Sequence, residues 1–505
     1  MQGKPDSDRQ LLDATVFCRQ LVPEGSVQAF LCDHRSELFP DEDFADLFPS
    51  GRGRPSHPAE LVCSVMVLQA LEGLSDRDAM RELRNRIDWK VACGLPLDHP
   101  GFDHTVLTFW RAKLRGSQHP ERIFDAIRRV VEVTGVLAKK TRRALDSTIL
   151  DDAVATQDSV TQLIGAIRRV RRVVPQAQAV GLVTASDAGG KPVIDWSDRR
   201  AKDELITALV NDANAVLSVT ERLKLTNEQQ DAVGLLALVA GQDVEPGESQ
   251  GTWHIARGVA KDRVISTVDV EARHGHKSTA VRKDGFKAHL VIEPDTGIIT
   301  AAQITPANAP DGPVGVLLME DEPRPLEVLG DSAYGSGNTR TQLKAQGHAL
   351  VIKAMPSRPN ITDGFARDDF IVDHEARSVT CPAGHVARVS DSGVAKFSPH
   401  CGSCPIKSRC TRAKARSFSV GPNDEELVLA RAEWRTEEIK SAYRTHRPMV
   451  ERSIAWLVAK NNRRLRYRGI EKNNEWLLVR VAALNLRRLV NLGLTNEQGW
   501  VLKTT

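Results

Sequence analysis

Hydrophobic residues recur at helical spacing through most of the first 140 residues. AELVCSVMVLQALEGL predicts one buried helix, and SDRDAMRELRNRIDW predicts a second that begins at the candidate cap Ser75. TVLTFWRAKLRG predicts a third helix after the candidate cap Asp103. Short helices with tight turns and a basic last member are typical of a helix-turn-helix, although a helical bundle that binds no DNA has the same pattern.

Strand patterns begin after residue 140. Residues 141–150 predict a strand, helical periodicity returns over 151–250, and DRVISTVDV predicts another strand. GFKAHLVIE and IITAAQITPA predict a hairpin joined by the Pro-Asp-Thr-Gly turn at 294–297. PLEVLGDSAYGSG predicts a strand that closes on Asp331, and TRTQLKAQGHALVIKAM predicts a helix followed by a strand.

This order of elements predicts an interrupted α/β architecture. We expect a helical N-terminal domain at 1–140 and an α/β domain at 141–490. A helical insert at 151–250 and a cysteine-containing insert at 365–425 interrupt the α/β domain, and 491–505 form a C-terminal tail.

Charge and hydropathy limit the partners of the chain. The net charge is +4, from 69 basic and 65 acidic residues, so any nucleic-acid surface must be local. No uncharged apolar run approaches the roughly 20 residues that cross a bilayer, and the first twenty residues do not form a secretory signal. We therefore expect a cytoplasmic protein without a membrane partner. Two basic groups are candidates for DNA binding, unless they are solvated helix faces: Arg111, Lys113 and Arg115, and Lys460, Arg463, Arg464, Arg466 and Arg468.

Three acidic residues carry the candidate chemistry. Asp146 lies in ALDST, Asp331 follows a strand pattern in LGDSAYGSG, and Glu451 lies in an amphipathic helix. Taken singly, Asp146 is better explained as a cap or turn residue, and Asp331 is equally explained as a turn residue. Together, oxygen ligands from remote segments are suited to Mg²⁺, and two such ions can drive phosphoryl transfer. Asp269 competes with Asp146 for the first position, and Asp151 and Asp152 are further competitors.

The helix around Glu451 adds two auxiliary candidates. Tyr443, Arg447 and Glu451 are spaced by four, which places them on one helical stripe. Arg447 could form a surface ion pair with Glu451 or grip a phosphate while Glu451 holds a metal ion. Pro448 predicts a kink, or alternatively a helix start that would break the stripe.

The chain resembles bacterial insertion-sequence DDE transposases over nearly its whole length. The resemblance rests on three segments in this order: ALDST, LGDSAYGSG, and this helix followed by Arg-rich RRLRYRG. The resemblance implies an α/β ribonuclease H-like catalytic fold with helical insertions behind an all-α N-terminal domain. It also implies that Asp146, Asp331 and Glu451 bind two Mg²⁺ (or Mn²⁺) ions, which cleave double-stranded transposon ends and join them to target DNA. Tyr443 and Arg447 match the auxiliary tyrosine and arginine of the family. Joining two ends in one event favours a homodimer on DNA.

The signature around the glutamate departs from the family in two places. The tyrosine precedes the arginine by four residues instead of three, with His446 at the intervening place. The signature lysine, seven residues after the glutamate, is Val458 here. Arg452 or Arg463 could take its place. Trp456 could stack on a flipped base, although the sequence favours a role in core packing.

The late cysteines predict a zinc site. Cys401 and Cys404 form a C-x₂-C half-site that Cys381 and Cys410 would complete, and His385 or His400 could replace either. The usual second C-x₂-C is missing, so four unliganded thiols remain an alternative. Two functions compete with transposition: a ribonuclease H-like nuclease without strand transfer, and a zinc-containing DNA-binding regulator without catalysis.

Overall fold

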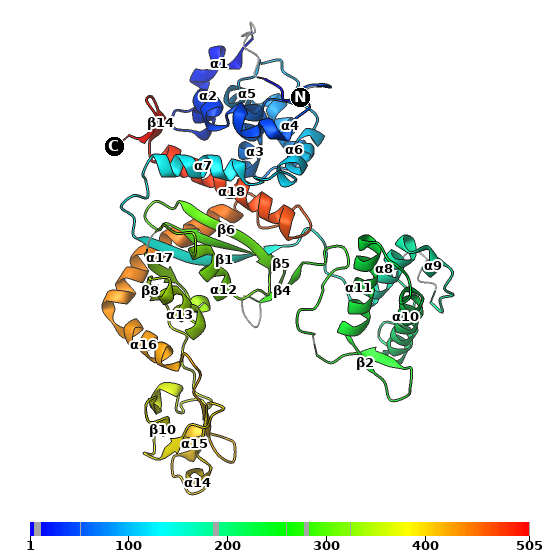
Figure 1. Cartoon of the computed structure of the whole chain (residues 1–505), viewed down its shortest axis with the longest axis vertical. Coiled ribbons are helices and arrows are strands. Elements are labelled where there is room, and N and C mark those ends of the chain that lie inside the picture. Colours follow the sequence, from blue (N-terminus) through cyan, green and yellow to red (C-terminus); the bar gives the residue numbers. More distant parts are fainter. Residues whose placement is uncertain are drawn as a thin grey trace.

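A six-stranded mixed sheet forms the centre of the computed structural model (Figure 1). The structure describes residues 1–4, 12–50, 52–184, 191–258, 260–276, 282–323 and 325–503. In sheet order the strands are β6 (Ile299–Pro306), β5 (Arg282–Ile292), β1 (Arg142–Asp151), β7 (Glu327–Gly330) and β8 (Ala349–Ile352), and β4 (Arg273–His276) pairs with the start of β5.

The sheet divides into an antiparallel and a parallel half at β1. β1 and β6 both run antiparallel to β5, and the predicted β5–β6 hairpin is present. β7 runs parallel to β1, and β8 runs parallel to β7. The short β7 and β8 therefore end on the same edge of the sheet as the part of β1 that contains Asp146.

Helices cover both faces of the sheet. The short helices α12 (Asp311–Met319) and α13 (Gly337–Ala345) pack with the sheet around a small core that includes Leu145 and Tyr334. The long helices α17 (Glu437–Val458) and α18 (Ile470–Asn491) share the main core with the other face. This mixed α/β layering, with a helical region before it, is the predicted ribonuclease H-like fold class.

The helical N-terminal region packs on α18 and shares the main core (Figure 1). At its centre, α3 is almost wholly buried, which confirms the predicted buried helix. The short 3₁₀ helices η1 (Arg19–Leu21) and η2 (Asp41–Leu47) connect its elements. Its α-helices are α1 (Ala14–Phe17), α2 (Val27–Leu38), α3 (Ala59–Glu72), α4 (Asp76–Asn85), α5 (Ile87–Cys93), α6 (Thr105–Arg115) and α7 (Arg122–Val133).

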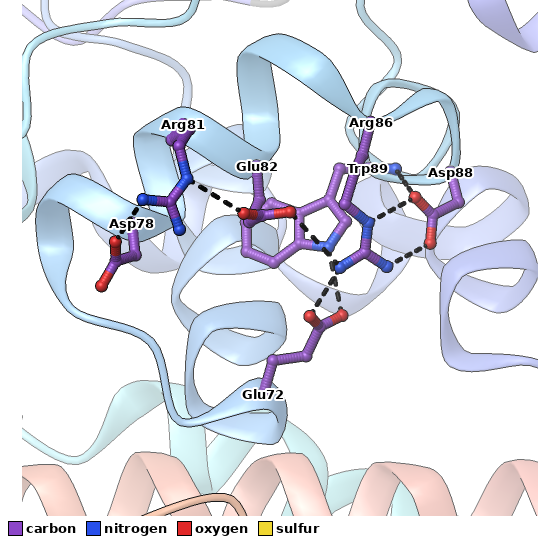
Figure 2. Close-up of polar contacts among 7 residues, drawn as sticks. All are labelled: Glu72, Asp78, Arg81, Glu82, Arg86, Asp88 and Trp89. Carbon is purple, nitrogen blue, oxygen red and sulfur yellow. Dashed lines mark hydrogen bonds and ion pairs between the residues drawn. The ribbon is translucent and has the colours of Figure 1, made fainter.

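The helix predicted from Ser75 onward is two helices, and the break lies at Arg86. Ser75 caps α4 as predicted, but the backbone of Arg86 is extended and α5 begins after it. Figure 2 shows the cause: the Arg86 guanidinium is held by both oxygens of Asp88, at 2.9 and 2.6 Å, and by Glu72 at 2.6 Å. Glu72 also accepts the indole N–H of Trp89 at 3.2 Å. Tertiary ion pairs thus override the helical pattern of the sequence.

The first insert folds around its own hydrophobic core, to one side of the sheet (Figure 1). It contains α8 (Ser159–Val173), α9 (Pro175–Gln178), α10 (Arg199–Thr220), α11 (Asn227–Gln242) and the hairpin of β2 (Val244–Pro246) and β3 (Trp253–Ile255). The strand predicted over 262–270 is wrong. Side chains of the insert hold this backbone instead, since Gln242 accepts from the Val264 N–H and Gln157 from the Thr267 N–H.

The second insert consists of short strands around a small aromatic core that includes Phe370, Phe397 and Phe418. It leads into α16 (Asp424–Arg435), which lies between this insert and α17 (Figure 1). Its elements are η4 (Arg367–Asp369), β9 (Ile371–Asp373), β10 (Ser378–Thr380), β11 (Val386–Arg388), β12 (Val394–Lys396), α14 (Ser398–Cys401), α15 (Lys407–Cys410) and β13 (Ser417–Ser419). The chain ends in a hairpin of β14 (Leu494–Asn496) and β15 (Trp500–Leu502). No described helix is both long and apolar enough to span a bilayer.

Candidate active site

The register of β1 and β7 brings two of the predicted acids to the same level of the sheet. Ala144 pairs with Leu329 across these parallel strands. Asp146 and Asp331 each follow their strand partner by two residues, so they lie side by side where β7 ends. Asp331 begins the 3₁₀ turn η3 (Ser332–Tyr334), and its carboxylate accepts the N–H of Ala333 at 2.8 Å. An acid just past the carboxyl end of a strand is in the usual position for ligand contact in an α/β sheet.

The third acid approaches on α17. This helix continues through Pro448, so the alternative start at that residue is wrong and the stripe of Tyr443, Arg447 and Glu451 is intact. The Glu451 side chain is 67% exposed, whereas Asp146 is buried. One acid of the predicted triad is therefore fixed inside the fold and one is open to solvent.

Arg447 joins the carboxylates. Its Nη2 lies 2.9 Å from Oδ2 of Asp146, and its Nε lies 3.3 Å from Oε1 of Glu451. Burial by itself would lower the pKa of Arg447, but the charges of Asp146, Tyr443 and Asp331 and the hydrogen bond to Glu451 raise it. Arg447 thus contacts two of the predicted acids directly, and the charge of the third, Asp331, also affects its pKa.

The carboxyl group of Asp146 holds a proton more tightly than usual. Burial raises its pKa to about 6, against the opposing effect of Arg447, and the charges of Asp331 and Asp311 raise it further. Burial also raises the pKa of Tyr443, and the charges of Asp331, Asp146 and Glu451 raise it further. Accumulated negative charge in a partly buried site is typical of a site that takes up a cation.

The donor set is suited to Mg²⁺ or Mn²⁺, since Asp146, Asp331 and Glu451 offer only carboxylate oxygens. The Arg447 guanidinium lies between the Asp146 and Glu451 carboxylates. It supplies the positive charge that a bound metal cation would otherwise supply to them. Within the described ranges, no three His, Cys, Asp or Glu side chains are grouped closely enough to hold a metal ion. The chemistry of the residues therefore fits the ions, although the described side chains are not gathered into a metal site.

A polar network behind Asp146 was missed in the sequence. Ser147 Oγ donates to Asp311 Oδ1 at 2.6 Å, and Lys287 Nζ lies 3.2 Å from the same carboxylate. Burial raises the pKa of Tyr334, and Asp311, Asp146 and Asp331 add to the effect. In the sequence, Lys287 interrupts the apolar pattern of GFKAHLV on the face that packs against α12. This interruption was the one sequence feature that pointed to a polar network there. Asp311 itself has the pattern of an ordinary first-turn helix acid.

The competing aspartates lie in other contacts. Asp269 accepts the N–H of Gly469 at 2.9 Å and of Glu271 at 3.3 Å. Burial of Asp152 and, as the second cause, the negative charge of Asp269 raise the pKa of Asp152 to about 6. Asp151 pairs with Lys283 at 3.0 Å. None of these three acts on Arg447 as Asp146 does.

Contacts within the chain occupy several of the predicted DNA-binding residues. In the first group Arg111 is buried and pairs with Asp76, Arg115 pairs with Glu475 at 2.7 Å, and Lys113 is exposed. In the second group, Arg463 donates to the carbonyl of Ile149 at 3.2 Å. The remaining members of that group have exposed side chains: Lys460, Arg464, Arg466 and Arg468.

The four late cysteines line one pocket of the second insert. Cys381, Cys401, Cys404 and Cys410 surround it together with His385 and His400, whose rings stack at 4.5 Å. All four are free thiols. Burial raises the pKa of Cys410, and the neighbouring thiols add to that effect. The predicted residues thus line one pocket, although the described residues include no group close enough to hold a metal ion.

Comparison with known families agrees with this geometry. The family model described as "Transposase DDE domain" matches residues 380–490, which include Glu451 and both long helices. The model described as "Transposase domain (DUF772)" matches residues 17–113 in the helical N-terminal region. No curated protein and no solved structure matches the chain.

The mixed sheet, its covering helices and the helical N-terminal region are consistent with the ribonuclease H-like class of proteins. The two matches, at opposite ends of the chain, support an insertion-sequence DDE transposase. The matched families support a function in transposition, and transposases act on DNA.

Proposed function

We propose that the protein cleaves DNA at the ends of its transposon and joins the freed 3′-hydroxyl to target DNA, with Asp146, Asp331 and Glu451 as the catalytic acids. The observation that supports this best is the pairing of β1 with β7. It sets Asp146 beside Asp331, and Arg447 links Asp146 to Glu451. Two Mg²⁺ or Mn²⁺ ions held by these acids would activate the attacking oxygen and stabilise the leaving oxygen of the phosphodiester.

Arg447 has two roles in this proposal. Before DNA binds, it lowers the pKa of Asp146 and so keeps that carboxylate available as an anion. With DNA bound, it turns its guanidinium to the phosphate, which a planar fork of N–H donors suits. Tyr443 packs edge-on against Trp434 at 5.2 Å, which positions its hydroxyl beside the acids.

We assign recognition of the transposon ends to the helical N-terminal domain, residues 1–140. The 141–490 domain carries the catalytic acids. Lys113, Lys460, Arg464, Arg466 and Arg468 remain the predicted phosphate contacts with exposed side chains. Arg111 and Arg115 would have to leave their carboxylate partners to take part. A homodimer would bring two ends together for one joining event.

We further propose a structural Zn²⁺ ion in the second insert, held by Cys381, Cys401, Cys404 and Cys410. The four thiols that line one pocket and the small core of this insert support the zinc proposal. A few buried aromatic residues contribute little folding free energy unless a bound metal ion adds to it. Protein purified without chelator should contain close to one equivalent of zinc. Less than half an equivalent would contradict the proposal.

The direct test of the chemistry uses purified protein and duplex DNA that carries the sequence flanking its gene. We expect strand cleavage with Mg²⁺, none with EDTA, and none with Asp331→Ala. Joined products should appear when target DNA is added. Cleavage without joining would favour the alternative nuclease, and binding without cleavage under any metal condition would favour the regulator.

A further inference from the structure

Two arginines of α18 lie against the ring of Trp456 on α17. The guanidinium carbons of Arg487 and Arg488 are 5.2 and 5.3 Å from its centroid. Trp456 follows Arg447 by nine positions, which at about 100° per residue places it on the opposite side of the helix. The ring of Trp456 therefore already packs against both arginine side chains.

Neither arginine has an acidic partner in the described part of the chain. Arg488 donates from Nε to the carbonyl of Thr296 at 2.7 Å. Arg487 makes no hydrogen bond or ion pair with a described residue, and its Nη2 is buried without an acceptor. The exposed Arg452, next to Glu451, likewise has no ion-pair partner among the described residues.

These arginines repel one another. Burial lowers the pKa of Arg488, and the charge of Arg452 lowers it further. Burial also lowers the pKa of Arg487, and here the second cause is Arg488. Arg447 shows the reverse, because carboxylates raise its pKa. A cluster of like charges is costly in the free protein, and a bound anion would remove that cost.

The turn between β5 and β6 fixes this cluster in place. Gly297 has a φ of +75°, and a Cβ there would meet Met449 Sδ at 3.0 Å and Arg488 Nε at 3.5 Å. The turn therefore needs glycine for both its conformation and the close approach of these side chains. Arg488 is thus held on backbone before any ligand arrives, which reduces the entropy cost of binding.

Arg480, about two turns earlier on α18, is an arginine with a structural role. It is buried and donates to the carbonyls of Ala70 and Leu71 at the end of α3 and of Trp456 and Leu457 at the end of α17. Its donors are satisfied within the chain, whereas those of Arg487 are not. The two residues therefore serve as a matched pair for experiment.

We propose that Arg452, Arg487 and Arg488 form a phosphate-binding subsite for the backbone of the DNA that the active site acts on. This inference rests on the proposed function. Charge complementarity identifies the ligand, since guanidinium groups without an acidic partner among the described residues suit the phosphodiester anion. Contacts of this kind position DNA without reading its sequence.

The test is the salt dependence of binding to a mixed-sequence DNA duplex, measured by fluorescence anisotropy. Arg452→Gln and Arg487→Gln should each weaken binding at low salt. Each should also lower the slope of log K against log salt by about 1, and the double variant by about 2. The matched control is Arg200→Gln on α10, which removes the same charge from an arginine paired with Glu204 at 3.0 Å. Slopes equal to that control would overturn the subsite.

Thermal unfolding separates binding from a structural role. Arg487→Gln should leave Tm at or above that of the wild type because it removes repulsion, whereas Arg480→Gln should lower Tm. A lower Tm for Arg487→Gln, with the salt slope unchanged, would make Arg487 structural. Asp331→Ala should keep the wild-type slope without cleaving. Failure of the wild type to cleave its flanking DNA would count against the proposed function, while the slopes would still decide the subsite.

Discussion

The acidic site on the sheet and the charged network between α4 and α5 use the same residue types in different ways. In the network, Arg86 meets Asp88 and Glu72 through hydrogen bonds of 2.6 to 2.9 Å between residues close in sequence (Figure 2). At the sheet, Arg447 reaches acids from β1 and α17, and the Asp146 carboxyl keeps a pKa of about 6. The paired charges around Arg86 fix a local break in the backbone. The incompletely balanced carboxylates around Arg447 mark the place where we expect chemistry.

The largest effect should come from removing a carboxylate of the sheet site. Asp146→Ala, Asp331→Ala and Glu451→Ala should each lower DNA cleavage on the order of 10³-fold or more, since groups that act as one unit fail together. DNA binding should persist in gel-shift assays. Asp269→Asn and the exposed Asp391→Asn should retain activity. Wild-type cleavage by any of the three alanine variants would remove that residue from the site.

Arg447→Gln should lower cleavage at least about tenfold and change its pH dependence. Arg447 lowers the pKa of Asp146, so its loss should move that pKa above about 6. The acidic limb of the rate profile should then shift to higher pH. The measurement is initial cleavage rate against pH, with Arg444→Gln, one turn earlier on α17, as the control. An unshifted limb would mean that Arg447 does not act on Asp146.

The network of Figure 2 should respond in stability and not in chemistry. Arg86→Ala should lower the free energy of unfolding by about 2 kcal/mol, because it leaves Glu72 and Asp88 without their partner. Arg81→Ala is the matched control, since its side chain is 61% exposed and its loss should cost less than about 0.5 kcal/mol. Urea denaturation measures both. Equal losses would show that the Arg86 contacts do not hold the break.

The smallest effect concerns the pH dependence of stability at Asp152. In the folded chain burial and Asp269 raise its pKa to about 6, whereas the unfolded chain releases the proton near pH 4. Between these values the folded state binds more protons, so stability falls as pH rises and stays lower above pH 6. Asp152→Asn should therefore reduce this fall in urea midpoints between pH 4 and 7, and Asp391→Asn should not. A fall as steep as that of the wild type would place the Asp152 pKa near its ordinary value.

Local signals predicted the elements, and tertiary contacts decided the exceptions. The α3 core helix, the β5–β6 hairpin and the stripe on α17 follow from periodicity and turn chemistry. The break at Arg86 and the irregular backbone over 262–270 depend on partners from other elements, which no local pattern contains. For the same reason the sequence favoured Arg111 as a DNA contact, while the fold pairs it with Asp76.

The candidate site divides in the same way. Asp146, Asp331 and Glu451 were predicted because each has a recognisable local frame. Their approach to Arg447 required the register of β1 with β7. Asp311 and Lys287 were missed because each has an ordinary explanation by itself, as an acid in the first turn of a helix and as a strand lysine. Only their contact behind Asp146 shows that they form one network.

The most direct test of the central claim is the mobility in cells of a marked DNA cassette bounded by the sequence that flanks this gene. Wild-type protein should move the cassette, and Asp331→Ala, expressed to the same level and able to bind the flanks, should not. Movement by both proteins would contradict the assignment of Asp331 to the chemistry. Movement by neither, with folded wild-type protein that binds the flanks, would contradict the proposed activity of this chain.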